Sequence, residues 1–369
     1  METNSIFDGV YSKMIEAEAF TGTDCVLPVT AGMTSDGNIK IVDLDTAPNI
    51  LIAGSIYQGK TTALNVAVTS LLFSKKPSEL KFVFIDPTMT AFPCYSNLDL
   101  GYMAVLPDST SGEAVVRKPE LAEKILRSLC VEMETRYEIK KRLPYLVIAI
   151  DEYADLLRLP DASVSRSIYE SIIKLACRGK NVGIHLMMTT SGLSVDVCNG
   201  VIKANFPVKF VFRTATGQDS YTLIDSTDAA LLEGRGDMLC CSDAGMERVQ
   251  CACITYEEIS KAVNSISCNM EHDVEKYSLP DPGDRVKIPV KTFDPDLAEI
   301  AKTVIKRKKI SVSDIQRMGY GYVRSQRIME QLEHLGIIES GIRSSEVKVR
   351  KLKDLEKILS QRDSAGDFR

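Results

Sequence analysis

No run of apolar residues in this 369-residue sequence approaches the roughly 18–20 that are needed to cross a bilayer, so no membrane segment is expected. The first five residues, Met1–Ser5, contain no basic group followed by an apolar stretch, which argues against a secretory signal. Internal repeats and low-complexity tracts are missing as well. These absences predict a globular, cytoplasmic protein.

Cysteine pairs at metal-binding spacing are also lacking. The ten cysteines form no C-x-x-C pair, and the nearest approaches are Cys240-Cys241 and Cys251-x-Cys253. A zinc site needs paired ligands at short spacing, and with three histidines in the chain none is expected. Scattered cysteines are typical of reduced, mostly buried thiols in the cytosol.

The composition is that of an ordinary globular protein, with 44% apolar and 26% charged residues. At roughly 100–200 residues per domain, two or three domains fit into the length. The net charge is −5, yet Lys287–Arg362 carries 17 lysines and arginines against 10 aspartates and glutamates. A basic C-terminal module suggests an anionic partner for that module.

Apolar runs alternate with helical patterns through the middle of the chain. The predicted strands are 49–53, 81–86, 145–150, 184–190, 208–213, 237–241 and 248–253, and the predicted helices are 61–74, 121–141 and 163–177. Before them, a helix is predicted over 8–19 and extended segments over 25–30 and 39–42. Continuous apolar strands between helices indicate an α/β fold with a mostly parallel sheet covered on both faces. Such sheets bind ligands at the carboxyl ends of their strands, where Gly54, Asp86, Asp151 and Thr190 fall.

A proline- and glycine-rich segment, Leu279–Asp284, separates this region from the basic module and has the composition of a linker. Beyond it, helices are predicted over 296–306, 311–318 and 322–335, followed by a hairpin over 337–342 and 346–349. Three helices and a hairpin form the order of a small winged-helix domain. The expected organisation is an N-terminal segment (1–45), an α/β domain (46–278), a linker (279–292), a winged-helix domain (293–352) and a charged tail (353–369), which is expected to fray after Leu355.

A phosphate-binding motif, G-x-x-x-x-G-K-[ST], follows the first central strand. It consists of Gly54, Ser55, Ile56, Tyr57, Gln58, Gly59, Lys60 and Thr61, and we assign these residues and Thr62 to ATP binding. The motif follows a predicted strand and opens a predicted helix, which is the context it requires. Loop N–H groups and the helix N-terminus would cradle the phosphates. Lys60 would reach the β- and γ-phosphates, and the Thr61 hydroxyl would bind Mg²⁺.

An apolar strand that ends in two acids supplies the second half of the site. Residues 146–150 are apolar and lead into Asp151 and Glu152, the arrangement called Walker B. Asp151 would hold magnesium, directly or through water, and Glu152 would act as general base toward the attacking water. Together the two motifs predict an ATP hydrolase with the P-loop NTPase (RecA-like) fold.

With these motifs the chain resembles the FtsK/SpoIIIE family of hexameric DNA translocases over about residues 31–338. Blocks similar to those of the family occur in the same order at 48–54, 84–87, 132–137, 150–156, 183–186, 194–197, 202–207 and 236–239. The resemblance implies an ATP- and Mg²⁺-dependent homo-hexamer that moves double-stranded DNA, in chromosome partition or mobile-element transfer. The family's N-terminal membrane anchor has no counterpart here, so tethering to a septum by this chain is not expected.

The C-terminal module shares the resemblance. Residues 322–333 look like the recognition helix of the family's gamma domain, a winged helix that reads short orienting sequences in duplex DNA. Arg324 and Arg327 lie three residues apart, on one helix face, and could reach guanine edges or phosphates. With Tyr322 and Ser325 they are the candidate DNA contacts.

Three positions depart from the family pattern. Ser191 stands where a glutamine of the family looks like a sensor of the γ-phosphate, and its side chain is too short to reach as far. Lys180 replaces the arginine finger that acts on a neighbouring subunit, and lysine lacks the bidentate fork of arginine. Arg178 could substitute if the loop shifts. Val323 replaces an asparagine of the recognition helix, so the preferred DNA sequence could differ.

These departures leave three hypotheses. The first is a DNA-stimulated translocase that tolerates Lys180 and Ser191. The second is a nucleotide- and DNA-binding assembly subunit with little turnover. The third is a coupling ATPase for conjugation or secretion, although the winged-helix module favours DNA over a protein cargo.

Overall fold

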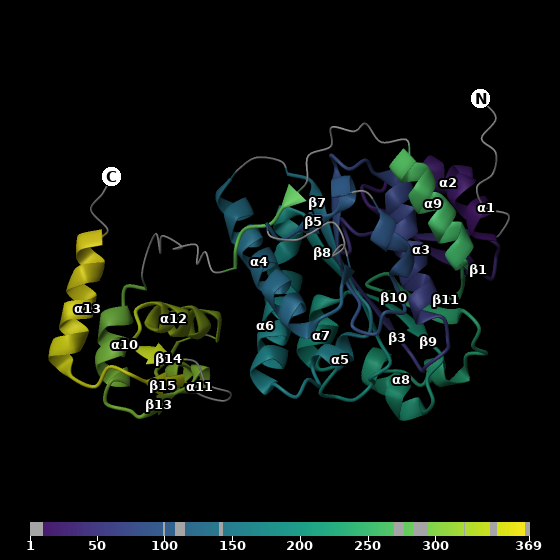
Figure 1. Cartoon of the computed structure of the whole chain (residues 1–369). Helices are drawn as coiled ribbons and strands as arrows, with labels where there is room; N and C mark the ends of the chain where they lie inside the picture. The colour runs from purple at the N-terminus through teal and green to yellow at the C-terminus, as the bar shows by residue number, and fades with distance from the viewer. Residues whose placement is uncertain are drawn as a thin grey trace. The chain divides into compact units, whose positions relative to one another are not determined.

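The computed structural model describes residues 10–98, 100–107, 115–139, 143–268, 277–282, 294–320, 322–339 and 345–365. The chain divides into two compact units, Met1–Val286 (unit 1) and Lys287–Arg369 (unit 2), each with its own secondary structure (Figure 1). Among the described residues, no helix combines the length and the apolar character that crossing a membrane requires.

Unit 1 is built on a ten-stranded sheet. In spatial order its strands are β2 (Ile39–Asp43), β1 (Pro28–Thr34), β11 (Gly245–Cys251), β10 (Asp237–Ser242), β9 (Val208–Phe212), β3 (Asn49–Ala53), β8 (Ile184–Thr190), β7 (Tyr145–Ile150), β4 (Leu80–Ile85) and β6 (Val115–Val116). Neighbours from β9 to β6 run parallel, and neighbours from β2 to β9 run antiparallel. The predicted mostly parallel α/β sheet is confirmed, with an antiparallel extension at one edge.

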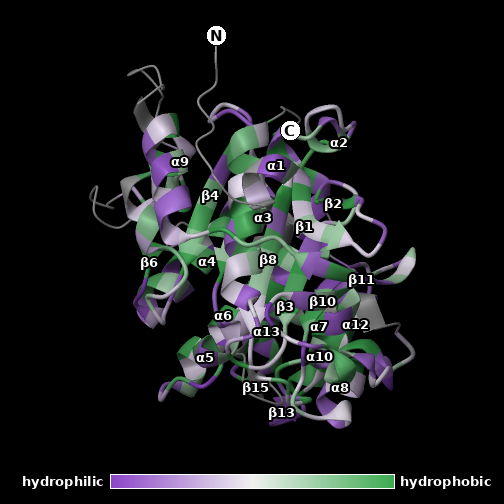
Figure 2. Ribbon diagram, turned by 90° about the vertical axis from the view of Figure 1, so that its right-hand side faces the viewer, coloured by the Kyte–Doolittle hydropathy of each residue, from purple (hydrophilic) through white to green (hydrophobic). Residues whose placement is uncertain are grey.

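Helices cover both faces of this sheet (Figure 1). One face carries α1 (Val10–Glu16), α3 (Lys60–Ser74) and α9 (Tyr256–Cys268), and the other carries α4 (Pro119–Glu138), α6 (Ala162–Arg178) and α7 (Gly200–Asn205). Alternate residues of each central strand enter opposite cores: in β3, Ile50 and Ile52 join the first, whereas Leu51 and Ala53 join the second. A strand buried on both faces must be apolar throughout, and Figure 2 shows β4 and β8 largely in the hydrophobic colour.

The predicted elements agree with the structure to within a few residues at most ends. The predicted helix 163–177 is observed as α6, the strand 184–190 as β8, and the helix 121–141 as α4, which begins and ends two to three residues earlier than predicted. The helix predicted over 8–19 is interrupted, because α1 is followed by a separate α2 (Glu18–Thr21). Several elements were not predicted, namely α5 (Tyr153–Leu156), α7, α8 (Gly217–Ile224), α9, β5 (Ala104–Val105), β6 and β12 (Tyr277–Ser278).

The stretch that leads out of unit 1 is packed against it. Strand β12 pairs in parallel with β5, and the Leu279 N–H donates to the Val105 carbonyl oxygen at 2.8 Å. Leu279 is 1% exposed. The Ser128 hydroxyl of α4 donates to the Pro280 carbonyl oxygen at 2.5 Å. The first residues of the predicted linker therefore contribute to the packing of unit 1.

Unit 2 has the predicted order of three helices and a hairpin. Its elements are α10 (Leu297–Val304), β13 (Lys309–Ile310), α11 (Val312–Gln316), α12 (Tyr322–His334), β14 (Ile338–Glu339) and β15 (Ser345–Val347), and the strands form an antiparallel sheet in the order β13-β15-β14. A capping box between Ser311 and Asp314 starts α11.

The prediction that the charged tail frays was wrong for most of its length. Helix α13 (Leu352–Ala365) forms there, and Leu355 is fully buried in the core of unit 2. The prediction considered only the high charge of the tail and overlooked the apolar residues Leu355 and Ile358, which pack this helix against the core of unit 2.

Candidate active site

The phosphate loop, residues 54–59, joins β3 to α3. Gly54 and Gly59 have φ angles of 150° and 113°, which residues with a side chain rarely adopt. A Cβ atom on Gly54 would stand 2.7 Å from the Phe212 Cβ, and one on Gly59 would stand 3.2 Å from the Phe212 ring. Both positions therefore require glycine, and the loop rests against the end of β9.

Two further contacts fix the backbone of the loop. The Ser55 N–H donates to the Arg213 carbonyl oxygen at 2.9 Å, and the Gly236 N–H donates to the Gln58 carbonyl oxygen at 3.2 Å. At the tip of the loop, Ile56 and Tyr57 are 63% and 98% exposed. Thr61 and Thr62, in the first turn of α3, are half-buried.

Lys60 lies under the loop. Its side chain is largely buried, and its Nζ donates to the Ser55 carbonyl oxygen at 2.8 Å. Burial lowers the pKa of the Lys60 ammonium, while the carboxylates of Glu152 and Asp151 act in the opposite direction. Lys60 follows the carboxyl end of β3 and the two acids follow the carboxyl end of β7, so the loop cation and both predicted acids lie at one edge of the sheet.

Asp151 follows β7 and is held by three hydroxyl groups. Thr189 donates to its Oδ1 at 2.7 Å, and Thr90 and Thr88 donate to its Oδ2 at 3.2 and 3.4 Å. The single hydrogen of the Thr88 hydroxyl is shared with Asp86 Oδ1, the nearer acceptor at 3.0 Å, which brings the end of β4 into the site. Burial raises the pKa of the Asp151 carboxyl, the Thr189 hydrogen bond lowers it, and the nearby Asp86 raises it further. Carboxylate and hydroxyl oxygens, which gather here, are the ligands that a hard cation such as Mg²⁺ prefers.

Glu152 is held by the end of β8. Its backbone is left-handed, with φ 48° and ψ 59°, and its N–H donates to the Thr189 hydroxyl at 2.8 Å. The Ser191 N–H lies 2.8 and 2.9 Å from the two carboxylate oxygens, and the Ser191 hydroxyl donates to Oε2 at 2.7 Å. The Thr190 hydroxyl adds a longer bond of 3.3 Å. Ser191 thus binds the predicted general base.

The parallel register explains why these residues meet. Ile150 of β7 is paired with Met188 of β8, so the two acids emerge beside the end of β8. The carboxyl ends of β3, β4, β7 and β8 share one edge of the sheet, which unites the loop, Asp86 and the two acids.

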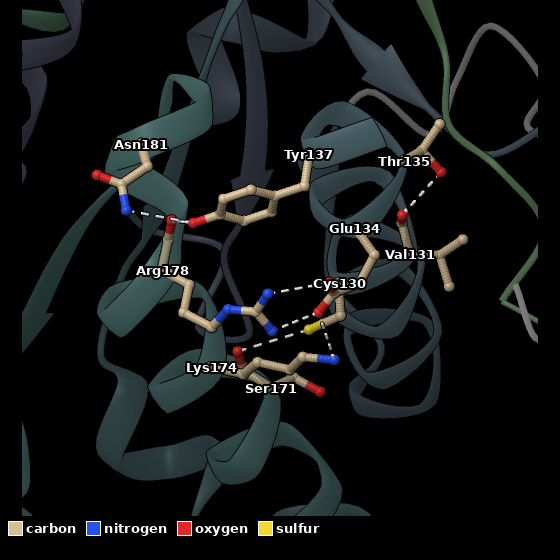
Figure 3. A network of polar contacts seen from close by, with 9 residues as sticks. All are labelled: Cys130, Val131, Glu134, Thr135, Tyr137, Ser171, Lys174, Arg178 and Asn181. Atoms are coloured by element: carbon tan, nitrogen blue, oxygen red, sulfur yellow. Dashed lines mark hydrogen bonds and ion pairs between the residues drawn. The ribbon is translucent and has the colours of Figure 1, made fainter. Parts of the chain in front are cut away.

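Arg178 and Lys180 lie at the other end of β8, and their partners come from the same chain. The Arg178 guanidinium donates to both oxygens of Glu134, at 2.6 and 3.1 Å, and stacks on the Tyr137 ring 5.0 Å from its centroid (Figure 3). Lys174 shares Glu134 Oε1 at 3.1 Å. Lys180 makes one bond of 3.2 Å to the Thr46 carbonyl oxygen. Arg178 is therefore bound in a bidentate ion pair, whereas the hydrogen bond of Lys180 to Thr46 is exposed to solvent.

In unit 2, Arg324 binds acids of its own domain. Its guanidinium donates to Asp294 Oδ1 and Oδ2 at 2.8 Å each and to Asp296 Oδ2 at 2.7 Å, and it stacks on the Tyr320 ring. Ser325 is fully buried. Arg324 therefore ties α12 to the segment before α10. The side chains of Tyr322, Val323 and Arg327 lie outside the part of the chain that the structure describes.

The ion pairs of Arg324 with Asp294 and Asp296 give a testable expectation for the Arg324→Gln variant. The substitution removes a guanidinium that donates to both oxygens of the buried Asp294 carboxylate, so unit 2 should melt several degrees earlier. If Arg324 acts through Asp294, the Asp294→Asn variant should lose thermal stability and DNA affinity in the same direction. The salt dependence of duplex DNA binding should keep its slope in both variants, whereas loss of a direct phosphate contact would reduce it by about 1.

Sequence reasoning missed several groups of the site. Thr88, Thr90 and Thr189 orient Asp151, and Arg213 braces the loop, but none belongs to a motif. Asp86, in contrast, is predicted at this edge because it ends a predicted strand. Nothing in the spacing of the threonines indicates that three separate segments bring them together.

Two family models match the chain. The model described as FtsK/SpoIIIE family matches residues 12–141, and the model described as Ftsk gamma domain matches residues 291–350. The first match contains the phosphate loop, and the second contains most of unit 2.

Curated proteins named DNA translocase FtsK are similar over most of the chain. The protein of Chlorobaculum tepidum is 33% identical over 96% of this chain and 47% of its own length. The protein of Lactiplantibacillus plantarum is 34% identical over 89% of this chain and 44% of its own length. The chain spans about half the length of the curated relatives it matches.

Solved structures share the fold. The pCW3 conjugation coupling protein TcpA, in a monomer form with ATPγS, has a TM-score of 0.56 at 21% identity, over 67% of this chain and 71% of TcpA. ATPases 2 and 3 of EssC from Geobacillus thermodenitrificans have a TM-score of 0.58 at 17% identity, over 78% of this chain and 56% of theirs. At these identities the likeness shows the fold alone.

Proposed function

The chain belongs to the FtsK/SpoIIIE family, and from this membership we propose that it is an ATP-driven translocase of double-stranded DNA. The observation that carries the proposal is the convergence of Lys60, Asp151 and Glu152 at one sheet edge under a phosphate loop. A loop of this kind binds nucleotide, and a carboxylate beside it supports hydrolysis rather than passive binding.

The proposed chemistry is the hydrolysis of ATP to ADP and phosphate. Loop N–H groups and Lys60 would hold the β- and γ-phosphates, and Glu152 would accept a proton from the water that attacks the γ-phosphorus as the bond to the leaving β-γ bridging oxygen breaks. Thr61 and Asp151 would hold magnesium, which neutralises phosphate charge when bound. Thr189 supports both acids, because it donates to Asp151 and accepts from the Glu152 N–H.

The proposed assembly is a homo-hexamer around duplex DNA. Each nucleotide would lie at a subunit boundary, where Lys180 of a neighbouring copy could approach it. Unit 2, with its match to the gamma domain, would bias loading and direction on DNA. Its excess of lysine and arginine suits a phosphate backbone.

One observation favours a second candidate, a nucleotide-binding assembly subunit with little turnover. Arg178 is bound to Glu134 within its own chain, so it would have to leave a bidentate ion pair before it could serve a neighbour. Lys180 alone would supply the charge in trans, without the geometry of a guanidinium.

Steady-state ATPase activity with and without long linear duplex DNA, across protein concentrations, tests the proposal. A translocase should be stimulated several-fold or more by duplex DNA and should displace a bound triplex-forming strand while ATP is consumed. ATP binding without hydrolysis at any protein or DNA concentration would instead establish the low-turnover subunit. Hydrolysis that ignores duplex DNA would contradict the DNA translocase.

A further inference from the structure

Arg213 stands beside the phosphate loop of its own chain. It directly follows β9, which pairs in parallel with β3, so both strands end at the same edge of the sheet. Its carbonyl oxygen accepts the Ser55 N–H at 2.9 Å. The preceding residue, Phe212, is the side chain on which Gly54 and Gly59 rest. The backbone of Arg213 is thus bonded to the start of the loop, and its neighbour Phe212 lies against both glycines.

The stem of this side chain lies near the second half of the loop. Arg213 Cδ is 3.9 Å from the point where a Cβ atom on Gly234 would stand, and Gln58 Oε1 is 2.6 Å from the same point. Gln58 directly precedes Gly59 and Lys60. Gly234 has a φ of 87° and no Cβ, which leaves room for both side chains.

The charge of Arg213 is not compensated within the described residues. The residue is exposed, and its guanidinium makes no hydrogen bond or ion pair with any part of the chain that the structure describes. Arg178, in contrast, is bound to Glu134 by two hydrogen bonds. An arginine with five donors, and with no partner for them among the described residues, therefore follows the strand that supports a loop shaped for phosphates.

We propose that Arg213 is a catalytic arginine supplied in cis, which binds the γ-phosphate of the nucleotide held by its own subunit. The inference rests on the proposed ATPase function and deepens it. During hydrolysis water attacks the γ-phosphorus, its proton passes to Glu152, and the β-γ bridging oxygen leaves with ADP. Arg213 stabilises the negative charge on the transferring phosphoryl oxygens and itself neither gains nor loses a proton.

A cis arginine explains how hydrolysis proceeds with lysine at position 180. The guanidinium and the nucleotide belong to one chain, so the essential arginine does not depend on the position of a neighbour. Assembly would then serve movement along DNA, and Lys180 would modulate the rate at the boundary between subunits.

The test compares Arg213→Ala, Arg213→Lys and Lys60→Ala at saturating duplex DNA. Arg213→Ala should lower kcat by about 10²–10³-fold, with a smaller change in the affinity for a non-hydrolysable ATP analogue, and Arg213→Lys should retain part of the rate. The bond to Ser55 comes from the Arg213 backbone, so the alanine variant keeps it, and thermal unfolding should confirm an unchanged fold. Arg166→Ala, at a half-buried arginine of α6 that pairs with Glu170, is the control and should leave kcat unchanged.

Subunit mixing separates supply in cis from supply in trans. Arg213→Ala subunits mixed with tagged Lys60→Ala subunits should co-purify and recover no ATPase activity, because neither chain holds both groups. Recovery of activity in the mixture would overturn the proposal, as would an Arg213→Ala variant with the wild-type kcat. If no assembly forms and wild-type monomers still hydrolyse ATP, the arginine must act in cis. Full activity of Lys60→Ala by itself would instead remove the proposed ATPase function.

Discussion

Lys60→Ala is expected to reduce ATP hydrolysis by about 10²–10³-fold, the effect of removing one preorganised donor from a site of developing charge. The ammonium is largely buried under the loop and donates to Ser55, so it enters the site already dehydrated and oriented. Its attraction to phosphate is correspondingly stronger than that of an exposed lysine. Steady-state kcat and the affinity for ATP, both measured with saturating duplex DNA, check the prediction.

A matched control lies just beyond the C-terminal end of the same helix. Lys76 is exposed and carries the same charge, so Lys76→Ala should change kcat by less than about twofold. The Lys60→Ala variant should remain folded, because it relieves the burial of a charged group whose pKa is already lowered. A Lys60→Ala variant that hydrolyses ATP at the wild-type rate would exclude this loop as the hydrolytic site.

Local patterns explain what could be predicted from the sequence. The loop motif and the apolar strand before Asp151 each lie within one short stretch of sequence, and each predicted strand or helix has its own local periodicity. Burial on both faces forces β3, β7 and β8 to be apolar, so these strands and their carboxyl-end residues were placed correctly. Because Asp151 and Glu152 directly follow β7, the same reasoning predicted that both acids lie at the carboxyl edge of the sheet.

Long-range packing explains what could not be predicted. The DNA contact of Arg324 stays a prediction, but the sequence gives no sign that Asp294, thirty residues earlier, binds its guanidinium. Ser191 was considered only as a shortened phosphate sensor, whereas the register of β7 and β8 brings it to Glu152. Contacts of this kind depend on strand pairing and domain packing, and no spacing in the sequence encodes them.

Glu152→Gln is expected to lower hydrolysis by about 10²–10⁴-fold while ATP still binds. Glutamine has the same shape, and its carbonyl can accept the Ser191 N–H while its amide donates to the Ser191 hydroxyl, so the strained backbone at φ 48° keeps its supports. What is lost is the ability to accept a proton from water. Single-turnover hydrolysis and equilibrium binding of ATP separate the two effects, and Asp155→Asn, an exposed carboxyl on α5, should be neutral in both.

Ser191→Ala distinguishes a residue that positions Glu152 from one that contacts nucleotide. The substitution removes the 2.7 Å hydrogen bond to Glu152 Oε2 and leaves the backbone N–H in place, so we expect kcat to fall by up to about tenfold. In a Glu152→Gln background the same change should have no effect on the residual rate, because the group it orients can no longer act as base. A loss of ATP affinity in both backgrounds would contradict this assignment and would mean that Ser191 contacts the γ-phosphate after all.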